Sequence, residues 1–149
     1  IEDLTPLFNI AANNLSKKML FANGEHRNYT WTKKDCFVLM NCDTPEYWNG
    51  QHLTATTSLW VKNQENIDFL KEYQKYLKDP RIVTDDFNMF GSNRPQFKDH
   101  RHDQSVLSLM SIKYKIELYR DPSQFGNLFI DKFPNSPYRQ LTNHHRGNI

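Results

Sequence analysis

The segment KDHRHDQSVLSLM, residues 98–110, gathers side chains that could carry out chemistry directly before an apolar run with helical spacing. Imidazoles and carboxylates are common proton carriers and metal ligands in proteins. His100 and His102 are two residues apart, so their rings point the same way only where the backbone is extended. With Asp103 nearby, the two imidazoles could hold a divalent ion, although their spacing alone favours a pair of exposed loop histidines.

Asp103 also occupies a position typical of a helix N-cap. An aspartate just before an apolar-periodic run favours this role, which is worth about 1 kcal/mol, and Gln104 would then be a first-turn residue. The same helix end presents free amide groups and partial positive charge, which suit an anionic ligand. The cap role therefore does not exclude a role in binding.

The last seven residues, NHHRGNI, supply His144 and His145 beside Arg146. Adjacent side chains diverge, so at most one of the two imidazoles easily faces a given site. That imidazole could bind a metal ion or a phosphate, and it could equally belong to a solvated chain end. We expect this tail to fold back onto the acidic start of a helix at 103–115 and to form a common pocket with it.

Other polar residues carry weaker signals. Asp85 and Asp86 are adjacent, so their carboxylates diverge and a dyad that shares one proton is not expected. A sugar-binding surface would use amides such as Gln51 and Gln104 together with aromatic rings. Tryptophans more often pack in a core or at its edge, and the chain has three: Trp31, Trp48 and Trp60.

Composition excludes several classes of protein. A chain of 149 residues with 24% charged and 13% aromatic residues is neither a disordered tail nor a membrane protein. The net charge of +2, spread along the chain, gives little reason to bind nucleic acid. Without an apolar run of about 20 residues or a basic and apolar leader, we expect no transmembrane segment and a cytoplasmic location. Cys36 and Cys42 are then expected to be free, buried thiols.

The elements that must position these residues follow a mixed α/β order. Helices are expected at 3–15, 31–41, 64–79 and 103–115, with Thr32 capping the second and a helical turn at 43–49. Strands are expected at 17–23, 51–63, 116–120 and 127–134, and an ordered loop at 81–101. This pattern predicts a mixed sheet flanked by helices, with residues 1–149 forming one domain or part of one.

Five segments occur in an order that resembles a family of nucleotide-sugar-dependent glycosyltransferases of bacteria and large viruses, which have a GT-A-type fold. The segments are EHRNYTWTKKDCFVLM, QHLTATTSLWVKN, RIVTDDFN, HRHDQSVLSLM and NHHRGNI. The similarity runs from about Leu4 to His145. Its most specific motif is HRHDQS followed by an apolar helix, and WTKKD is the next. The fold implied is the C-terminal half of a GT-A domain.

The resemblance implies transfer of a sugar from a nucleotide-diphosphate donor to a saccharide or glycoconjugate acceptor, assisted by Mn²⁺ or Mg²⁺. It implies that Asp103 binds sugar hydroxyls and that Gln104 faces the anomeric carbon. The remaining expected site residues divide into two groups. Substrate contacts are expected from His102, Gln51 and Asp86, and a metal ligand from His144 or His145.

The chain departs from the family pattern at one motif. It contains no Asp-x-Asp, the motif that holds the metal against the donor diphosphate, and IEDLTPLFN resembles the segment that follows this motif. We therefore expect a fragment of a larger glycosyltransferase domain, or a partner chain that supplies the missing half, and little or no turnover by these residues alone.

Two alternatives remain open from the residues. One is a small metal-dependent hydrolase that uses His100, His102 and Asp103 with His144. The other is a non-catalytic carbohydrate-binding or protein-interaction module built on the aromatic strands.

Overall fold

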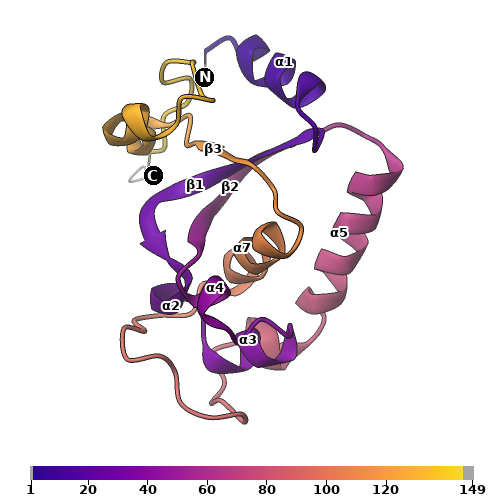
Figure 1. Ribbon diagram of the computed structural model, residues 1–149, viewed down its shortest axis with the longest axis vertical. Coiled ribbons are helices and arrows are strands. Elements are labelled where there is room, and N and C mark those ends of the chain that lie inside the picture. The colour runs from indigo at the N-terminus through magenta and orange to yellow at the C-terminus, as the bar shows by residue number, and fades with distance from the viewer. Residues whose placement is uncertain (1, 146–149) are drawn as a thin grey trace.

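A three-stranded mixed sheet lies at the centre of the structure, a computed structural model that describes residues 2–145 (Figure 1). The central strand is β1 (Lys18–Arg27). Strand β2 (Gln51–Trp60) runs antiparallel along one side of β1, and the short strand β3 (Leu118–Arg120) runs parallel along the other. The expected α/β class and mixed sheet are confirmed at this level.

Strand β1 is longer than the sequence pattern predicts. We expected Asn23-Gly24 to end it, but the strand continues to Arg27. The pairing with β2 shifts register between Ala22 and Arg27, and Gly24 lies inside this irregular stretch with a φ of 54°. Glycine tolerates this left-handed conformation without steric cost, so here it bends the strand instead of turning the chain back.

Seven α-helices and one 3₁₀-helix complete the described part of the chain. They are α1 (Thr5–Asn13), α2 (Asn28–Trp31), α3 (Lys34–Leu39), α4 (Pro45–Trp48), α5 (Gln64–Leu77), α6 (Pro80–Val83), α7 (His102–Lys113) and η1 (Gln124–Lys132). The expected helix at 64–79 is confirmed because its local signals agree: the Asn63 side chain accepts from Asn66 N at its start, and Pro80 follows its end. None of these helices is long and apolar enough to cross a bilayer.

The two faces of β1 are covered by different apolar clusters. Leu20 points into the α7-side cluster, which contains residues of β2, α3 and α7 such as Leu53, Phe37 and Leu109. Met19 and Phe21 point into the α1-side cluster, whose other members are Leu7, Ala11, Tyr119, Tyr138 and Leu141. Because successive side chains of β1 point to opposite faces of the sheet, this one strand contributes to both clusters.

Helix α7 is buried over most of its length because its sequence alternates small hydroxyl residues with apolar ones. Ser105 through Ser111 are all buried. The serines satisfy backbone groups: Ser105 Oγ donates to Trp31 O at 2.6 Å, and Ser108 Oγ accepts from Leu53 N at 2.9 Å. Small side chains bring the helix close to β2, which fixes the position of its first turn.

Three local predictions are wrong. The expected strand at 127–134 falls largely within η1. Ser123 caps the start of this 3₁₀-helix, where its Oγ accepts a hydrogen bond from Phe125 N at 3.3 Å. Thr32 does not cap a helix: α3 begins two residues later, and Thr32 is buried after the end of α2. Asp103 is not an N-cap either, because α7 begins at His102 and Arg101 holds the cap position.

The two cysteines are free and buried, as expected. Burial raises the pKa of both thiols, that of Cys42 to about 11, so they are packing residues of the α7-side cluster and not reactive groups.

Candidate functional site

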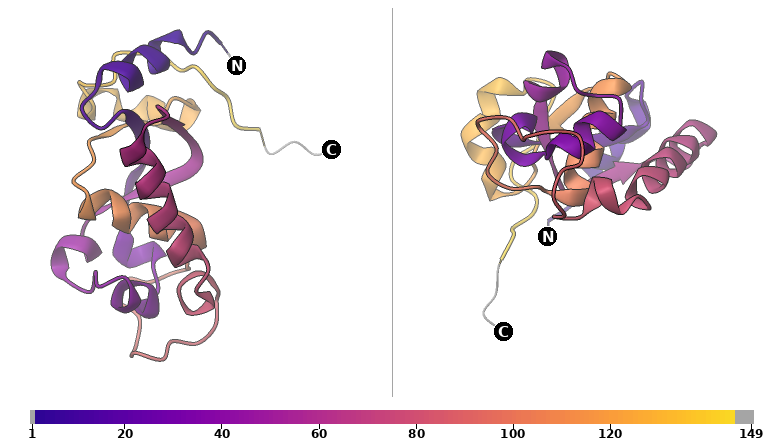
Figure 2. Two further views of the ribbon diagram at one scale, coloured as in Figure 1. Left: turned by 90° about the vertical axis from the view of Figure 1, so that its right-hand side faces the viewer. Right: turned by 90° about the horizontal axis from the view of Figure 1, so that it is seen from below.

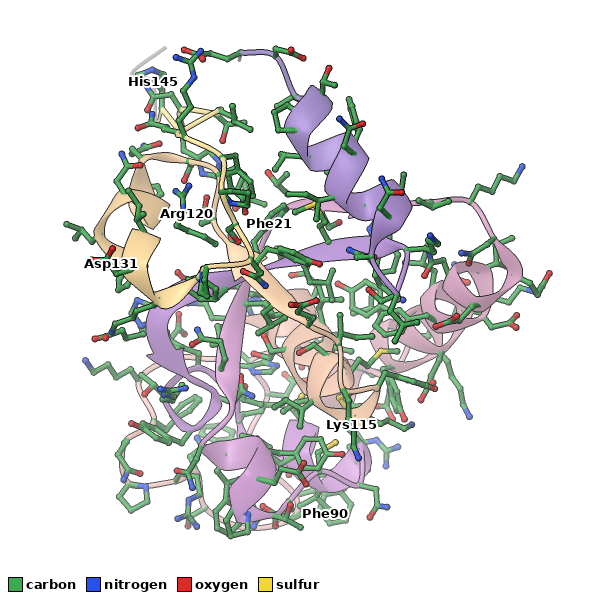
Figure 3. The ribbon with its side chains drawn as sticks, turned by 45° about the horizontal axis from the view of Figure 1, so that its top comes forward. Phe21, Phe90, Lys115, Arg120, Asp131 and His145 are labelled. Carbon is green, nitrogen blue, oxygen red and sulfur yellow. The ribbon has the colours of Figure 1, made fainter. Side chains whose placement is uncertain are left out.

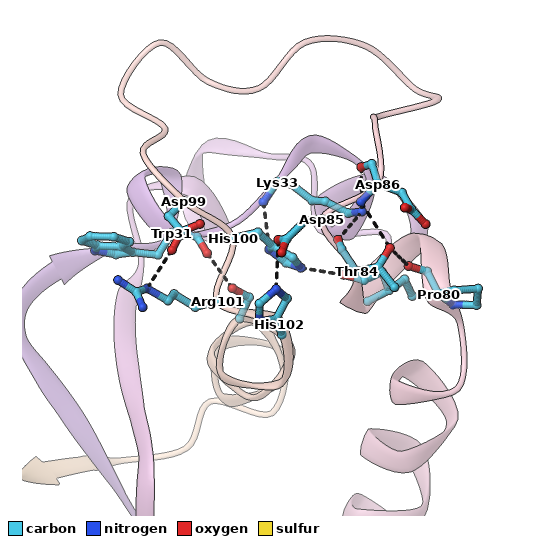
Figure 4. Close-up of polar contacts among 12 residues, drawn as sticks. Trp31, Lys33, Pro80, Thr84, Asp85, Asp86, Asp99, His100, Arg101 and His102 are labelled. Atoms are coloured by element: carbon cyan, nitrogen blue, oxygen red, sulfur yellow. Dashed lines mark hydrogen bonds and ion pairs between the residues drawn. The ribbon is translucent and has the colours of Figure 1, made fainter. Parts of the chain in front are cut away.

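The first turn of α7 meets an irregular segment, residues 84–101, that arches over it (Figure 4). This segment contains Asp85, Asp86 and His100 of the polar residues that the sequence singled out. Although its sequence has no periodic pattern, the segment is held in place by hydrogen bonds to the side chain of Asp35 in α3.

Asp35 anchors the far part of this segment. Its side chain is 1% exposed, and its carboxylate accepts hydrogen bonds from Met89 N at 2.8 Å and Phe90 N at 3.0 Å. In return, Asn88 Oδ1 accepts from Asp35 N at 3.1 Å. A buried carboxylate with backbone N–H partners is a strong, charge-assisted anchor, so the segment is an ordered wall of the site.

His100 belongs to the scaffold and not to the reactive surface. It is 2% exposed, its Nδ1 lies 3.3 Å from Lys33 N and its Nε2 lies 2.7 Å from Ile82 O. Since Lys33 N–H can only donate, Nδ1 is the acceptor and Nε2 carries the proton given to Ile82 O. Burial lowers the pKa of His100 to about 4. Both ring nitrogens are engaged, so His100 is not free to hold an ion together with His102, and the favoured interpretation of two exposed loop histidines fails for His100, which is buried.

His102 is the exposed member of the pair. Its Nε2 lies 2.9 Å from Asp85 Oδ1, and the side chains of the two residues are 47% and 71% exposed. The hydrogen bond from His102 holds the pKa of the Asp85 carboxyl below its ordinary value. His102 has a φ of 48°, a left-handed conformation that it shares with Lys17, Asn41 and Lys115 and that does not by itself mark a functional site.

Asp103 and Gln104 follow in the first turn of α7. The Asp103 carboxylate is exposed, and its backbone carbonyl accepts from Tyr73 Oη at 3.2 Å. Gln104 is half-buried, and its Nε2 donates to Leu53 O at 2.6 Å. The carboxamide nitrogen of Gln104 is thus tied to β2. An acidic side chain at a helix start interacts favourably with the helix dipole.

A cavity of about 240 Å³ lies under the 84–101 segment. Lys33 and His100 line it from the buried side, and Asp85 and Asp86 line it beside the His102 pair. Asp86, expected to contact substrate, therefore lies where a ligand could reach it.

Gln51 is placed differently. It starts β2, and its Nε2 donates to His26 O at 3.2 Å and His52 O at 2.8 Å. The side chain bridges the ends of β1 and β2, and Gln51 does not line the cavity. Its expected contact with substrate stays a prediction.

The tail histidines lie elsewhere, and the expected pocket shared with α7 is wrong. His144 N donates to Gln124 Oε1 at 2.9 Å and its ring meets Phe125 at 5.9 Å, while Asn143 Nδ2 lies 3.0 Å from His145 Nε2. The tail runs out from the body beside η1 (Figure 2), at the opposite end of the molecule from Phe90 (Figure 3). These neighbours attach the tail to η1 and not to the first turn of α7.

The described residues do not form a metal site by themselves. Within 2–145, no three His, Cys, Asp or Glu side chains are grouped so that they could hold an ion. Within the described residues, the polar neighbour of the His145 ring is the Asn143 amide and not a carboxylate. A metal bound by His144 or His145 would need further ligands from outside this group.

Sequence reasoning missed Lys33, Asp35, Asn88 and Asn93. The motif WTKKD, singled out by the resemblance, contained the signal for the first two. The two asparagines lie in an aperiodic stretch, and nothing local marks them.

Comparison of the chain with models of known families, with curated proteins and with solved structures gave no match.

Proposed function

We propose that this chain is the acceptor-side part of a metal-assisted glycosyltransferase, which moves a sugar from a nucleotide-diphosphate donor to a saccharide or glycoconjugate. The observation that carries the proposal is the arrangement at the start of α7. An exposed histidine in a left-handed conformation, His102, is fixed by Asp85 next to the exposed carboxylate of Asp103. A buried framework of His100 and Ser105 holds this group in place.

Each residue has a role that its environment allows. The Asp103 carboxylate accepts hydrogen bonds from sugar hydroxyls, which are donors with free rotation. The bond of Gln104 to Leu53 O fixes its carboxamide, so that the remaining oxygen is oriented toward the reacting sugar carbon. The His102–Asp85 pair orients a hydroxyl of the acceptor. Positioning of this kind lowers the barrier by holding the reactants in a productive geometry.

The donor half is not part of this group of residues. The proposal therefore includes an Asp-x-Asp segment, from a longer chain or from a partner chain, that holds Mn²⁺ or Mg²⁺ near the start of α7. Within residues 2–145 no three His, Cys, Asp or Glu side chains are grouped as a metal site, and the roles given above do not depend on the ion.

The test is a sugar-transfer assay on the protein together with its Asp-x-Asp half, with candidate nucleotide sugars and with Mn²⁺ or Mg²⁺ present. We expect Asp103→Ala to lower kcat/KM about 100-fold, a magnitude typical of the loss of a group that orients or stabilises the reacting atoms. Asp131→Ala is the matched control, because Asp131 is exposed on η1, away from the site. An Asp103→Ala rate equal to that of the control would refute the assignment.

A carbohydrate-binding module without catalysis is the second candidate, favoured by the cavity beside Asp86. It differs in one measurable way: saccharide binding would persist while no donor gives transfer. The metal-hydrolase alternative is not favoured, because both ring nitrogens of His100 form hydrogen bonds with backbone groups.

A further inference from the structure

We propose that the cavity under the 84–101 segment binds one uncharged sugar ring, and that this ring belongs to the acceptor. The binding of a sugar follows from the cavity itself. The assignment of that sugar to the acceptor rests on the proposed function.

The cavity is in the right place for such a ligand. Asp85 lines it and also bonds to His102 at 2.9 Å, so a ring inside lies next to the exposed groups of α7. Asp35, Asn88 and Asn93 hold its outer wall: Lys34 N donates to Asn93 Oδ1 at 2.8 Å, and Asn88 Nδ2 donates to the same oxygen at 2.7 Å. The wall is therefore formed before a ligand arrives.

The lining has both donors and acceptors to spare. Lys33 is 3% exposed, and its Nζ donates to Thr84 O at 2.7 Å and Asp86 O at 3.3 Å, which uses two of its three N–H groups. Among residues 2–145 the Asn93 Nδ2 group and the Asp86 carboxylate form no hydrogen bond or ion pair. Hydroxyl groups both donate and accept, so a polyol matches this mixed lining better than a ligand with donors alone or acceptors alone.

One wall is apolar. Phe97 is half-buried in the lining, and the side chain of Phe87 is 99% exposed at its edge. A sugar ring has an apolar C–H face that packs on an aromatic side chain, whereas its hydroxyls point sideways to the polar groups.

The charge of the cavity lining favours an uncharged acceptor sugar over the anionic donor and over acidic sugars. The lining contains one more acid than base: its acids are Asp85, Asp86 and Asp99, and its bases are Lys33 and Lys98. Arg101, outside the lining, lies 3.6 Å from Asp99 and offsets its charge. Within residues 2–145 no base pairs with the Asp86 carboxylate, so a diphosphate or a uronate would bring its negative charge next to that group. Uncharged rings are therefore preferred, and the donor phosphates bind elsewhere.

The experiment is a titration of the full chain, labelled with ¹⁵N, followed by NMR. The probes are the methyl glycosides of glucose, galactose and mannose, with glucuronic acid as the charged comparison. We expect saturable shifts of the Asn88, Asn93 and Lys98 amides with at least one neutral glycoside, and binding of glucuronic acid weaker by about tenfold. Phe97→Ala and Asp86→Ala should each weaken binding by about tenfold, and Asp131→Ala should not.

The outcomes separate this inference from the proposed function. Shifts confined to other surfaces, or equal binding by Phe97→Ala, Asp86→Ala and the control in spectra that show intact folding, overturn the cavity. Binding at the cavity without transfer from any donor supports the cavity and overturns the transferase. Transfer that is unaffected by both cavity variants overturns the cavity as the acceptor site and leaves the transferase standing.

Discussion

Two histidines are neutral and buried, and this gives the stability a defined dependence on pH. Burial lowers the pKa of His100 to about 4 and that of His52 to about 3, whereas an unfolded histidine titrates near 6.5. Above that value neither state binds the proton. As the pH falls below about 6.5, the histidines of the unfolded chain bind protons and the buried histidines of the folded chain do not, so the free energy of unfolding decreases.

We expect this decrease to be about 1.4 kcal/mol per pH unit for each histidine, from about pH 6.5 down to the folded pKa values. Urea unfolding at several pH values between 7 and 5 measures it. Imidazole ¹⁵N shifts provide the site-specific check, because His100 should remain neutral at pH 5, with its proton on Nε2. A His100 ring that titrates near 6.5 in the folded protein would contradict the buried assignment.

On the scale of elements, the part of the 84–101 segment around Met89 and Phe90 is anchored by the Asp35 carboxylate. Removing the side chain in Asp35→Ala leaves the Met89 and Phe90 amides without their buried acceptor. We expect a loss of about 3 kcal/mol in the free energy of unfolding and faster hydrogen exchange at both amides. Asp99→Ala is the control in the same segment: its carboxylate is exposed and 3.6 Å from Arg101, a contact worth less than about 1 kcal/mol. Equal protection of the two amides in both variants would show that the anchor is elsewhere.

The elements also show which contacts local sequence can predict. Helix α5 was found because its cap, its periodicity and Pro80 all act within a few residues, and strand β2 because it is rich in β-branched and aromatic residues. The start of α7 was placed one residue late because Arg101 holds the cap position without a side-chain hydrogen bond, and only such a bond leaves a signal in the sequence. The 127–134 segment looked like a strand, but its conformation follows from the Ser123 turn before it.

The sequence singled out His102, Asp85 and Asp86, but it did not indicate how they are arranged. Asp85 and His102 are 17 residues apart, and Asp35 and Met89 are 54 apart. No spacing rule connects such pairs. His100 and His102 look alike in sequence, yet one is 2% exposed and the other has a side chain 47% exposed. Burial decides which of them can do chemistry, and it is a property of the whole fold.

For the molecule as a whole, the shared strand β1 should make the two clusters unfold together. Leu7, 1% exposed, belongs to the α1-side cluster, whereas Trp48 and Trp60 pack against the α7-side cluster. Truncation in Leu7→Ala should cost about 3 kcal/mol. Because β1 has a face in each cluster, we expect tryptophan fluorescence and far-UV circular dichroism to report this loss at one common midpoint in urea.

Phe8→Ala is the matched control for this coupling, since Phe8 is the next residue of α1 and is 54% exposed. Its cost should be below about 1 kcal/mol. If Leu7→Ala lowered only the circular dichroism midpoint and left the tryptophan signal unchanged, the α1-side cluster would be unfolding separately. The first turn of α7 would then be held without it. A single shifted transition would instead mean that mutations near α1 reach the site through β1, by lowering the stability of the sheet against which α7 packs.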